Sequence, residues 1–396
     1  MEFEPIASNY TITAMLGQGT QAMVFKAIYT DVNGKEKPCA LKAINLDRSA
    51  QDLESLQSET KNLSLCKHKN VCPLYQSFVH SSYLWLVMPQ LKVSVLDMLQ
   101  TLQPIGFEEA VISTIMYDVL QALHYLHNKN QLHRDVKLSN FLLDSNGECF
   151  LADFGVAAMA RPFSNQIKCS TFVGSPLYMA PEIANNQFYD QSSDIWSFGI
   201  CMYQLAHGQL PHQNLTAMEA LIAIIQKDPP KCTQKRNFTK QLKEVIESCL
   251  VKDPKERPTT AKLLEMKFWQ KRVSEEQIQD MVSEYCVLKP IKQGAFQEQV
   301  SAANQILQGN GAQADSDFWD FDDKDPKELE MKEVSIIEEP HVPVLDQLAS
   351  NDIQQLQSLF SNFIVELQTL REQNTKLQKE NTQLKSRLQL FSQENH

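Results

Sequence analysis

Short apolar runs of β-forming residues dominate the first 90 positions of the chain. Tyr10–Leu16, Met23–Tyr29 and Cys39–Ile44 each have the composition of a strand, and Phe78–Met88 returns to the same pattern. Between these runs, residues 50–66 place leucines among charged residues at helical spacing. This part of the chain is expected to form a small β-rich lobe with one helix.

Helical periodicity takes over from position 108. Glu108–His127 repeats apolar residues every three or four positions, and Leu242–Leu250 and Thr259–Glu265 continue that rhythm. Ser192–Ala206 is apolar at nearly every position, which predicts a helix buried on all sides. A β-rich lobe followed by a larger helical lobe makes the fold α+β and bilobal, with the border between the lobes near Pro89–Val93.

The apolar period weakens beyond Trp269. Residues 285–343 are polar and without a clear period, and residues 270–345 are expected to form an acidic, mostly disordered linker. Within it, Asp317–Asp323 places three aromatic residues among acids. Such a segment is typical of a docking or autoinhibitory peptide that folds onto a partner. The alternative is a solvated acidic linker that happens to carry aromatics.

Residues 346–392 regain order as a heptad repeat, the pattern of a coiled coil. Alternating steps of four and three connect Leu356, Phe360, Phe363, Leu367, Leu370, Asn374, Leu377, Asn381, Leu384, Leu388 and Phe391. The facing pairs Glu366–Arg371 and Glu380–Lys385 are attractive in a parallel dimer, and the two asparagines favour two strands. The chain is therefore expected to form a homodimer through this segment. The alternative is a single amphipathic helix that docks on its own domain.

The charge distribution excludes two classes of partner. Residues 1–269 carry 25 Lys+Arg and 26 Asp+Glu (net −1), and residues 270–396 carry 12 and 22 (net −10). Neither part has the basic character that nucleic acid or anionic lipid requires. The N-terminus lacks a signal-peptide pattern and no apolar run is long enough for membrane insertion. With nine scattered cysteines, the chain is expected to be cytoplasmic, with a nuclear location as the alternative.

The stretch His133–Asn140, followed by Asp153-Phe154-Gly155, carries most of the chemistry. Asp135 can orient the proton of an attacking hydroxyl, and Lys137 can neutralise a transferring phosphoryl group. Asn140 and Asp153 offer oxygen ligands for Mg²⁺, with Mn²⁺ as a possible substitute. This spacing indicates phosphoryl transfer from ATP rather than a charged surface turn.

A second set of phosphate-binding residues precedes this stretch. Gly17–Val24 lies between two expected strands and has the glycine-rich composition that lets backbone N–H groups approach phosphates, although Ala22 stands where a third glycine is usual. Lys42 follows on an apolar strand. An ion pair with Glu59 on the following helix would hold Lys42 against the α- and β-phosphates.

With these motifs in order, residues 10–269 resemble a complete eukaryotic protein kinase domain. Ala180-Pro181-Glu182 and Asp194–Gly199 match two further motifs of that family. The resemblance implies that Asp194 caps the catalytic-loop backbone, that Arg257 pairs with Glu182, and that Lys42, Asp135 and Lys137 are catalytic. It also implies a nucleotide site lined by Leu16, Gly17, Gln18, Gly19, Thr20, Gln21, Ala22, Met23, Val24, Ala40, Lys42, Glu59, Met88, Leu91 and Leu142.

The acceptor and the regulation follow from the same resemblance. Lys137 in the catalytic loop, together with Ser175, is the serine/threonine pattern. Arg134 beside the catalytic Asp135 is a cation that a phosphate on the activation segment could neutralise, which would order that segment. Thr171 is the first candidate for this phosphate and Ser170 the second.

Within kinases, the chain resembles the sterile-20-like, germinal-centre group, and in it the Fray/oxidative-stress-responsive (SPAK-like) branch. The residues that carry this likeness are Thr171–Glu182, Ala22, Leu84–Met88 and Ser94–Asp97. The branch implies a stress or signalling cascade with an upstream kinase and an armadillo-like scaffold. Leu138-Ser139 departs from the usual Ala-Gly before the metal-binding Asn. The expected function is a non-specific serine/threonine protein kinase; the alternative is a catalytically weak pseudokinase that acts as a scaffold.

Overall fold

The computed structural model describes residues 3–18, 22–46, 60, 64–153, 176–185, 189–232, 237–289 and 296–309. All of them belong to the first of two units, Met1–Asp322, which are separated at Asp323. The predicted coiled coil, the Asp317–Asp323 segment and most of the helix predicted at 50–66 lie outside the described residues.

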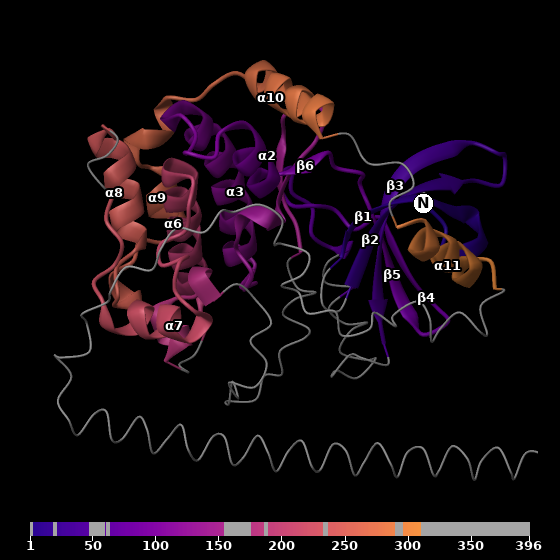
Figure 1. Ribbon diagram of the computed structural model, residues 1–396, viewed down its shortest axis with the longest axis horizontal. Helices are drawn as coiled ribbons and strands as arrows, with labels where there is room; N and C mark the ends of the chain where they lie inside the picture. Colours follow the sequence, from indigo (N-terminus) through magenta and orange to yellow (C-terminus); the bar gives the residue numbers. More distant parts are fainter. Residues whose placement is uncertain are drawn as a thin grey trace, which may run out of the picture. The chain divides into compact units, whose positions relative to one another are not determined.

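The N-terminal lobe is a five-stranded antiparallel sheet with the order β1-β2-β3-β5-β4 (Figure 1). Its strands are β1 (Tyr10–Gln18), β2 (Ala22–Thr30), β3 (Glu36–Asn45), β4 (Gln76–His80) and β5 (Tyr83–Met88), preceded by a short 3₁₀ turn, η1 (Ala7–Asn9). The stretch Phe78–Met88, which reads as one apolar run in the sequence, divides into two strands at Ser81, whose φ of 52° is the left-handed turn conformation.

The two faces of this sheet carry different residues. Val24, Lys42 and Leu86 are paired in one cross-strand row, and Phe25, Leu41 and Val87 form the adjacent row. Because side chains alternate along a strand, these rows point to opposite faces. The second face belongs to an aromatic-rich core that contains Tyr10, Phe25, Tyr29, Phe78 and Trp85.

The C-terminal lobe is built around two long helices, α3 (Glu109–Asn128) and α6 (Gln191–His207), which lie next to each other. Every residue of α6 from Ser193 to Ala206 is buried, which confirms the helix predicted to be enclosed on all sides. Gly208 ends α6 at a φ of 75°, and a Cβ atom there would meet the Pro104 carbonyl oxygen at 1.9 Å. Only glycine fits this helix end.

The remaining elements of this lobe surround those two helices. They are β6 (Val93–Ser94), α2 (Val95–Leu102), η2 (Leu138–Asn140), β7 (Phe141–Leu143), β8 (Cys149–Leu151), η3 (Pro176–Tyr178), α5 (Pro181–Ala184), α7 (Ala217–Gln226), α8 (Lys240–Cys249), η4 (Pro254–Glu256), α9 (Thr260–Leu264) and η5 (Lys267–Gln270). A small sheet has the order β6-β7-β8, and the catalytic stretch His133–Asn140 directly precedes β7. The predicted lobe border is confirmed, because β5 ends at Met88 in one sheet and β6 begins at Val93 in the other.

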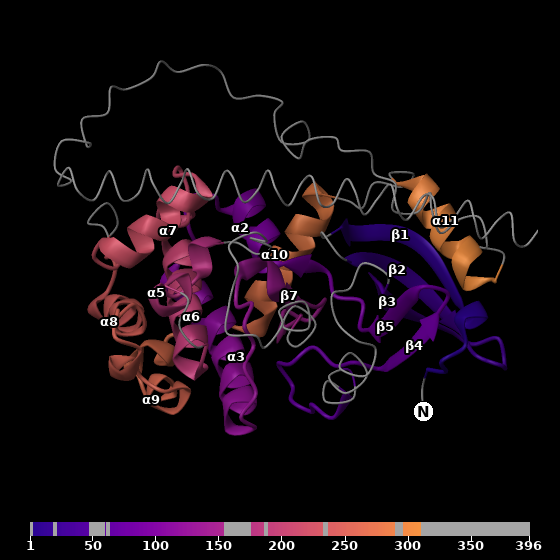
Figure 2. The same cartoon turned by 90° about the horizontal axis from the view of Figure 1, so that it is seen from below.

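The prediction of a mostly disordered linker over residues 270–345 is wrong for residues 275–288 and 297–307. Two helices form there, α10 (Glu275–Leu288) and α11 (Gln297–Leu307). Figure 2 shows α10 beside α2 in the C-terminal lobe and α11 along β1 in the N-terminal lobe. The residues that these helices bury are Ile278 and Val282 in α10 and Ala303, Ile306 and Leu307 in α11. In each helix they lie on one side, which suffices to hold a helix on an existing apolar surface. Among the described residues, no helix has the length and apolarity needed to cross a membrane.

Candidate active site

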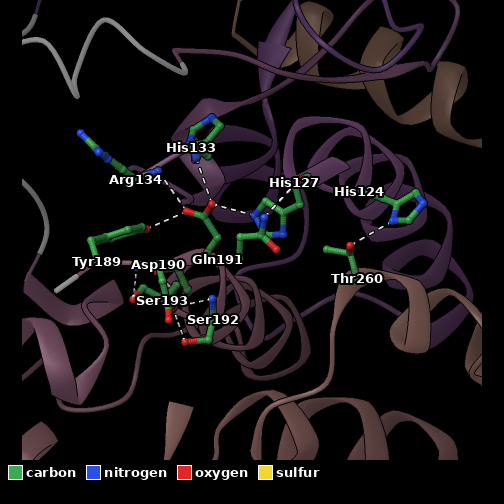
Figure 3. A network of polar contacts seen from close by, with 12 residues as sticks. His124, His127, His133, Arg134, Tyr189, Asp190, Gln191, Ser192, Ser193 and Thr260 are labelled. Carbon is green, nitrogen blue, oxygen red and sulfur yellow. Dashed lines mark hydrogen bonds and ion pairs between the residues drawn. The ribbon is translucent and has the colours of Figure 1, made fainter. Parts of the chain in front are cut away.

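The backbone that carries the catalytic stretch is held by one buried carboxylate. Asp194, in the first turn of α6, accepts hydrogen bonds from the backbone N–H groups of His133 and Arg134, each at 2.9 Å. His127 Nε2 and the Tyr189 hydroxyl donate to the same carboxylate at 2.9 and 2.6 Å, and Figure 3 shows these four residues converging. The predicted capping role of Asp194 is thereby confirmed.

The protonation state of Asp194 follows from these contacts. Complete burial raises the pKa of its carboxyl, but the hydrogen bond and charge of His127, with His133 and Tyr189, outweigh the burial and hold the pKa below its ordinary value. Asp194 is therefore ionised and accepts on both oxygens. That fixes Arg134 at a φ of 67°, a conformation that costs energy in any residue other than glycine.

The His133 ring connects the backbone at Asp135 with the backbone that precedes Asp153. Its Nε2–H donates to the Ala152 carbonyl at 3.1 Å, and its Nδ1 accepts from the Asp135 N–H at 3.2 Å. These two bonds require a neutral imidazole with the proton on Nε2. Burial of the ring lowers the pKa of His133, which favours the same neutral form.

Asp135, Lys137 and Asn140 form one hydrogen-bonded group. The Lys137 ammonium lies 2.8 Å from Asp135 Oδ2. Asn140 Nδ2 donates to the Asp135 carbonyl at 2.8 Å and to Asp135 Oδ2 at 3.0 Å. The amide and the ammonium thus hold the same oxygen, Oδ2, of the carboxylate that would orient a hydroxyl.

Lys42 and Asp153 connect the two lobes. Lys42 Nζ, on β3, lies 2.7 Å from Asp153 Oδ1, just beyond β8. Burial raises the pKa of Asp153, but the ion pair and hydrogen bond with Lys42, with a smaller contribution from Lys137, hold that pKa below its ordinary value. Asp153 is therefore an anion near neutral pH, and its φ of 63° is again the left-handed conformation that marks functional strain.

The donor set at Asn140 and Asp153 fits Mg²⁺. The Ala152 N–H donates to the Asn140 carbonyl at 2.9 Å, so the residues that supply a carboxamide and a carboxylate are tied together by their backbones. Within the described residues no cluster of three or more His, Cys, Asp or Glu could hold a metal ion alone. Mg²⁺ in phosphoryl-transfer sites typically uses one or two protein oxygen ligands, with phosphates and water completing the shell.

The predicted nucleotide-lining residues lie largely on one face of the N-terminal sheet. Val24 pairs with Lys42, and Ala40 pairs with Met88, so the side chains of all four point to the same side. Met23 does not join them. Its side chain is fully buried in the aromatic core on the opposite face, so only its backbone could face a nucleotide.

The other lining residues surround this face. Gly17 pairs with Val24, the register shifts at Leu16, β1 ends at Gln18, and β2 begins at Ala22. Leu142 lies on β7 in the C-terminal lobe, and the Leu91 N–H donates to the Pro89 carbonyl at 3.1 Å in the connection between lobes. The remaining predicted residues Gly19, Thr20, Gln21, Glu59, Ser170, Thr171 and Ser175 lie outside the described residues, so the Lys42–Glu59 pair stays a prediction.

The predicted Arg257–Glu182 pair is confirmed. The Arg257 guanidinium donates to the two Glu182 oxygens at 2.8 and 2.7 Å, in the two-pronged geometry that suits a carboxylate. Ser193 Oγ donates to Glu182 at 2.9 Å. Both charged residues are buried, so this contact fastens α5 against α6 beneath the catalytic stretch.

Two residues that support the site, His127 and Tyr189, were not predicted from the sequence. Both donate to Asp194, and His127 lies in the last turn of α3. A buried aspartate inside a helix as apolar as α6 needs such partners, because an unpaired buried carboxylate is costly. That requirement is the signal that could have directed attention to them.

Comparison with known proteins agrees with this geometry. The model of the family described as protein kinase domain matches residues 10–269. Serine/threonine-protein kinase fray2 of Dictyostelium discoideum is 38% identical over 267 residues, which cover 66% of this chain and 26% of the relative. Germinal center kinase 3 of Caenorhabditis elegans is 37% identical over 286 residues, covering 67% of this chain and 48% of the relative.

A third relative matches over nearly its whole length. Serine/threonine-protein kinase ppk11 of Schizosaccharomyces pombe is 32% identical over 314 residues, which cover 79% of this chain and 97% of the relative. By contrast, the chain spans only about a quarter to a half of the first two relatives.

Proposed function

This chain belongs to the protein kinase domain family, in its sterile-20-like, germinal-centre group, and from that membership we propose that it is an active serine/threonine protein kinase. The reaction is transfer of the γ-phosphate of ATP to serine or threonine side chains of protein substrates. Two of the relatives described above, fray2 and ppk11, are serine/threonine kinases by name.

One observation carries this proposal. All five polar side chains that phosphoryl transfer requires are present. They form two groups with contacts within each group: Lys42 with Asp153, and Asp135 with Lys137 and Asn140. The group around Asp135 comes from one loop, and the Lys42–Asp153 pair brings the N-terminal sheet to it. A scaffold without catalysis would not need both groups together.

The chemistry of the site follows from these positions. Asp135 accepts a hydrogen bond from the acceptor hydroxyl and aligns its oxygen with the phosphorus atom. Lys137, next to Asp135, balances negative charge on the transferring phosphoryl group, and Lys42 contacts the phosphates that stay behind. Asn140 and Asp153 would hold Mg²⁺, which supplies further neutralisation of phosphate charge.

The test uses the full-length protein, labelled ATP, Mg²⁺ and a generic protein acceptor. Label should appear on serine and threonine, and Asp135→Asn and Asp153→Asn should each abolish it. Asp228→Asn, an exposed carboxylate distant in sequence from these motifs, is the matched control and should keep full activity. Nucleotide binding by the wild type without any label transfer would instead favour the pseudokinase alternative.

Activation through the segment that follows Asp153 is part of the proposal. Arg134 lies directly beside Asp135, and a phosphate on Thr171 or Ser170 would be attracted to its positive charge. An upstream kinase and an armadillo-like scaffold are the proposed partners, and a cytoplasmic or nuclear location suits them. Thr171→Ala should lower activity, and phosphate mapping of the active protein should find Thr171 or Ser170 modified.

Dimerisation through residues 346–392 is proposed on the heptad pattern alone. A dimer raises the local concentration of one kinase domain for the other to the millimolar range, which favours phosphorylation between the two copies. A chain that ends at position 345 should have the mass of a monomer in solution and should activate at a rate that depends on protein concentration. If the full-length chain and the shortened chain contain the same number of copies per particle in solution, the proposed dimer is refuted.

A further inference from the structure

The helix α11 is a structural layer of the N-terminal lobe, although it follows the last kinase motif. Ala303, Ile306 and Leu307 are buried in the same core as Phe25 and Trp85, on the sheet face opposite Lys42. Figures 1 and 2 both place α11 beside the strands of this sheet. The nucleotide face and the α11 face are thus two sides of one thin sheet.

A side chain of α11 fills the open edge of β1. The strand order leaves β1 at one edge of the sheet, where its outward N–H and C=O groups have no neighbouring strand. Asn304 occupies this edge at Ile12. The Ile12 N–H donates to Asn304 Oδ1 at 2.8 Å, and Asn304 Nδ2 donates back to the Ile12 carbonyl at 2.9 Å.

The opposite edge of the sheet is tied to the same helix. His80 ends β4, the other edge strand, and its Nε2–H donates to the Ile306 carbonyl at 2.8 Å. α11 therefore bonds both edge strands while its apolar side chains cover the strands between them. Two polar contacts at the two edges fix the helix on the sheet in one orientation.

The bond at Ile12 lies upstream of the residues predicted to lie over the nucleotide. β1 continues from Ile12 to Leu16, Gly17 and Gln18, and its pairing with β2 is irregular at two places, between Ile12 and Ala14 and again between Met15 and Gly17. Such irregularities weaken the ladder that positions a strand. The hydrogen bonds from Asn304 hold Ile12 at the edge of β1 that does not face β2. They compensate there for the irregular pairing between β1 and β2.

We propose that Asn304 is a positioning residue for nucleotide binding: by holding Ile12 it fixes β1, and with β1 the Leu16–Gln18 segment that borders the nucleotide. The inference rests on the proposed function for the identity of the ligand. Asn304 touches neither nucleotide nor acceptor, so its contribution is to the affinity for ATP and not to the transfer step.

The test compares Asn304→Ala with Gln305→Ala, an exposed neighbour on the same helix, in the full-length protein. Binding of MgADP is measured by calorimetry, and kcat and the KM for ATP by label transfer. Asn304→Ala should raise both the MgADP Kd and the KM for ATP about three- to tenfold, since two hydrogen bonds to one strand are lost. The kcat should stay within about twofold, and Gln305→Ala should match the wild type.

Asn304→Asp provides a graded variant. It keeps the acceptor for the Ile12 N–H but loses the donor to the Ile12 carbonyl, so its MgADP affinity should lie between those of the wild type and the alanine variant. Unchanged affinity in Asn304→Ala, or a lower kcat at unchanged KM, would overturn the proposal. MgADP binding does not require phosphoryl transfer. A wild-type protein that binds MgADP but does not phosphorylate an acceptor would therefore refute the kinase activity and leave the role of Asn304 intact.

A measurement on the wild type keeps the proposal testable even if Asn304→Ala does not fold. If docked α11 tightens nucleotide binding, bound nucleotide must stabilise docked α11 by the same factor. Hydrogen exchange at the amides of residues 303–307 should therefore slow about three- to tenfold at saturating MgADP. Exchange that is identical with and without MgADP would refute the link between α11 and the nucleotide.

Discussion

Lys42 Nζ and Asp153 Oδ1 lie 2.7 Å apart, in an ion pair that joins positions 111 residues apart in the chain. The ammonium keeps the carboxylate ionised and lies on the same sheet face as Val24 and Ala40. Lys42→Met should therefore remove a phosphate ligand and also raise the pKa of Asp153. We expect kcat/KM for ATP to fall on the order of 10²–10³-fold in a label-transfer assay.

The matched control for this change is Lys35→Met, an exposed lysine in the turn before β3. It should retain wild-type kinetics. A Lys42→Met protein with more than half of the wild-type activity would contradict the catalytic assignment of this pair.

Asp194 contacts the catalytic stretch through the backbone N–H groups of His133 and Arg134. Its substitution therefore separates the positioning of that stretch from nucleotide binding. In Asp194→Asn one oxygen remains, while the amide N–H₂ faces a backbone N–H of His133 or Arg134. The catalytic loop should shift, and kcat should fall about 10²-fold, as expected for a misplacement near 1 Å. MgADP affinity should change little, since Lys42 and the N-terminal sheet are untouched. An effect confined to MgADP affinity would rule out this role.

Arg257 offers a test of stability rather than catalysis. Arg257→Ala leaves Glu182 buried without its partner and removes the donors to the Val251 and Ser192 carbonyls. We expect a loss of about 3–5 kcal/mol in the free energy of unfolding, measured by urea denaturation. Arg257→Lys keeps the charge but cannot contact both carboxylate oxygens, and should lose less. Equal stability of Arg257→Ala and the exposed control Lys262→Ala would contradict the prediction.

The half-buried carboxyl of Asp118 on α3 makes stability depend on pH. Burial raises its pKa from 3.8 to about 6, a shift that the Cys149 N–H, Lys69 and Arg272 reduce and that Glu148 increases. At this carboxyl the folded protein thus binds a proton more tightly than the unfolded chain does. The contribution of Asp118 to stability is therefore fully present below about pH 4 and is lost as pH rises through about 6.

Asp118→Asn should remove that penalty. At pH 7.5 the variant should be more stable than the wild type by up to about 3 kcal/mol, following the conversion of a pKa shift into free energy. At pH 4 the two proteins should unfold at nearly the same urea concentration, because the wild-type carboxyl is then protonated when folded. A stabilisation that is equal at both pH values would show that the change acts through packing and not through ionisation.

The catalytic residues could be found in the sequence because their chemistry requires fixed local spacing. Asp135, Lys137 and Asn140 come from a single loop, so their proximity is set by the chain itself. Contacts between distant segments were harder to anticipate from residues alone. The capping by Asp194 and the Arg257–Glu182 pair were expected only through the family resemblance.

The helices α10 and α11 were missed because their own sequences are polar. For α11 the informative signal was in a strand that it helps to cover: β5 is buried at Tyr83, Leu84, Trp85, Leu86 and Val87 in succession. A strand that is apolar at consecutive positions has both faces covered. The nucleotide side accounts for one face, so a further element had to cover the other, and that element proved to lie beyond position 269.

The extent of the folding unit can be tested by truncation. A chain that ends at Gly309 keeps α10 and α11 and should fold as the full-length protein does. A chain that ends at Trp269 loses Ile278 and Val282 from one lobe and Ile306 and Leu307 from the other. Each such side chain contributes about 1.5–3 kcal/mol when fully buried, so together they rival the 5–15 kcal/mol stability of a typical domain. We expect the chain that ends at Trp269 to aggregate or to unfold at much lower urea concentration.

A chain that ends at Lys289 separates the two helices. It keeps α10 on the C-terminal lobe but uncovers the aromatic face around Phe25 and Trp85, so it should bind a hydrophobic dye and bind MgADP more weakly than the chain that ends at Gly309. Urea denaturation, dye fluorescence and calorimetry on the three truncated chains show which of the two helices each lobe requires. Equal stability and equal MgADP affinity in all three would mean that the folding unit ends at Trp269 and that α11 only rests on the sheet.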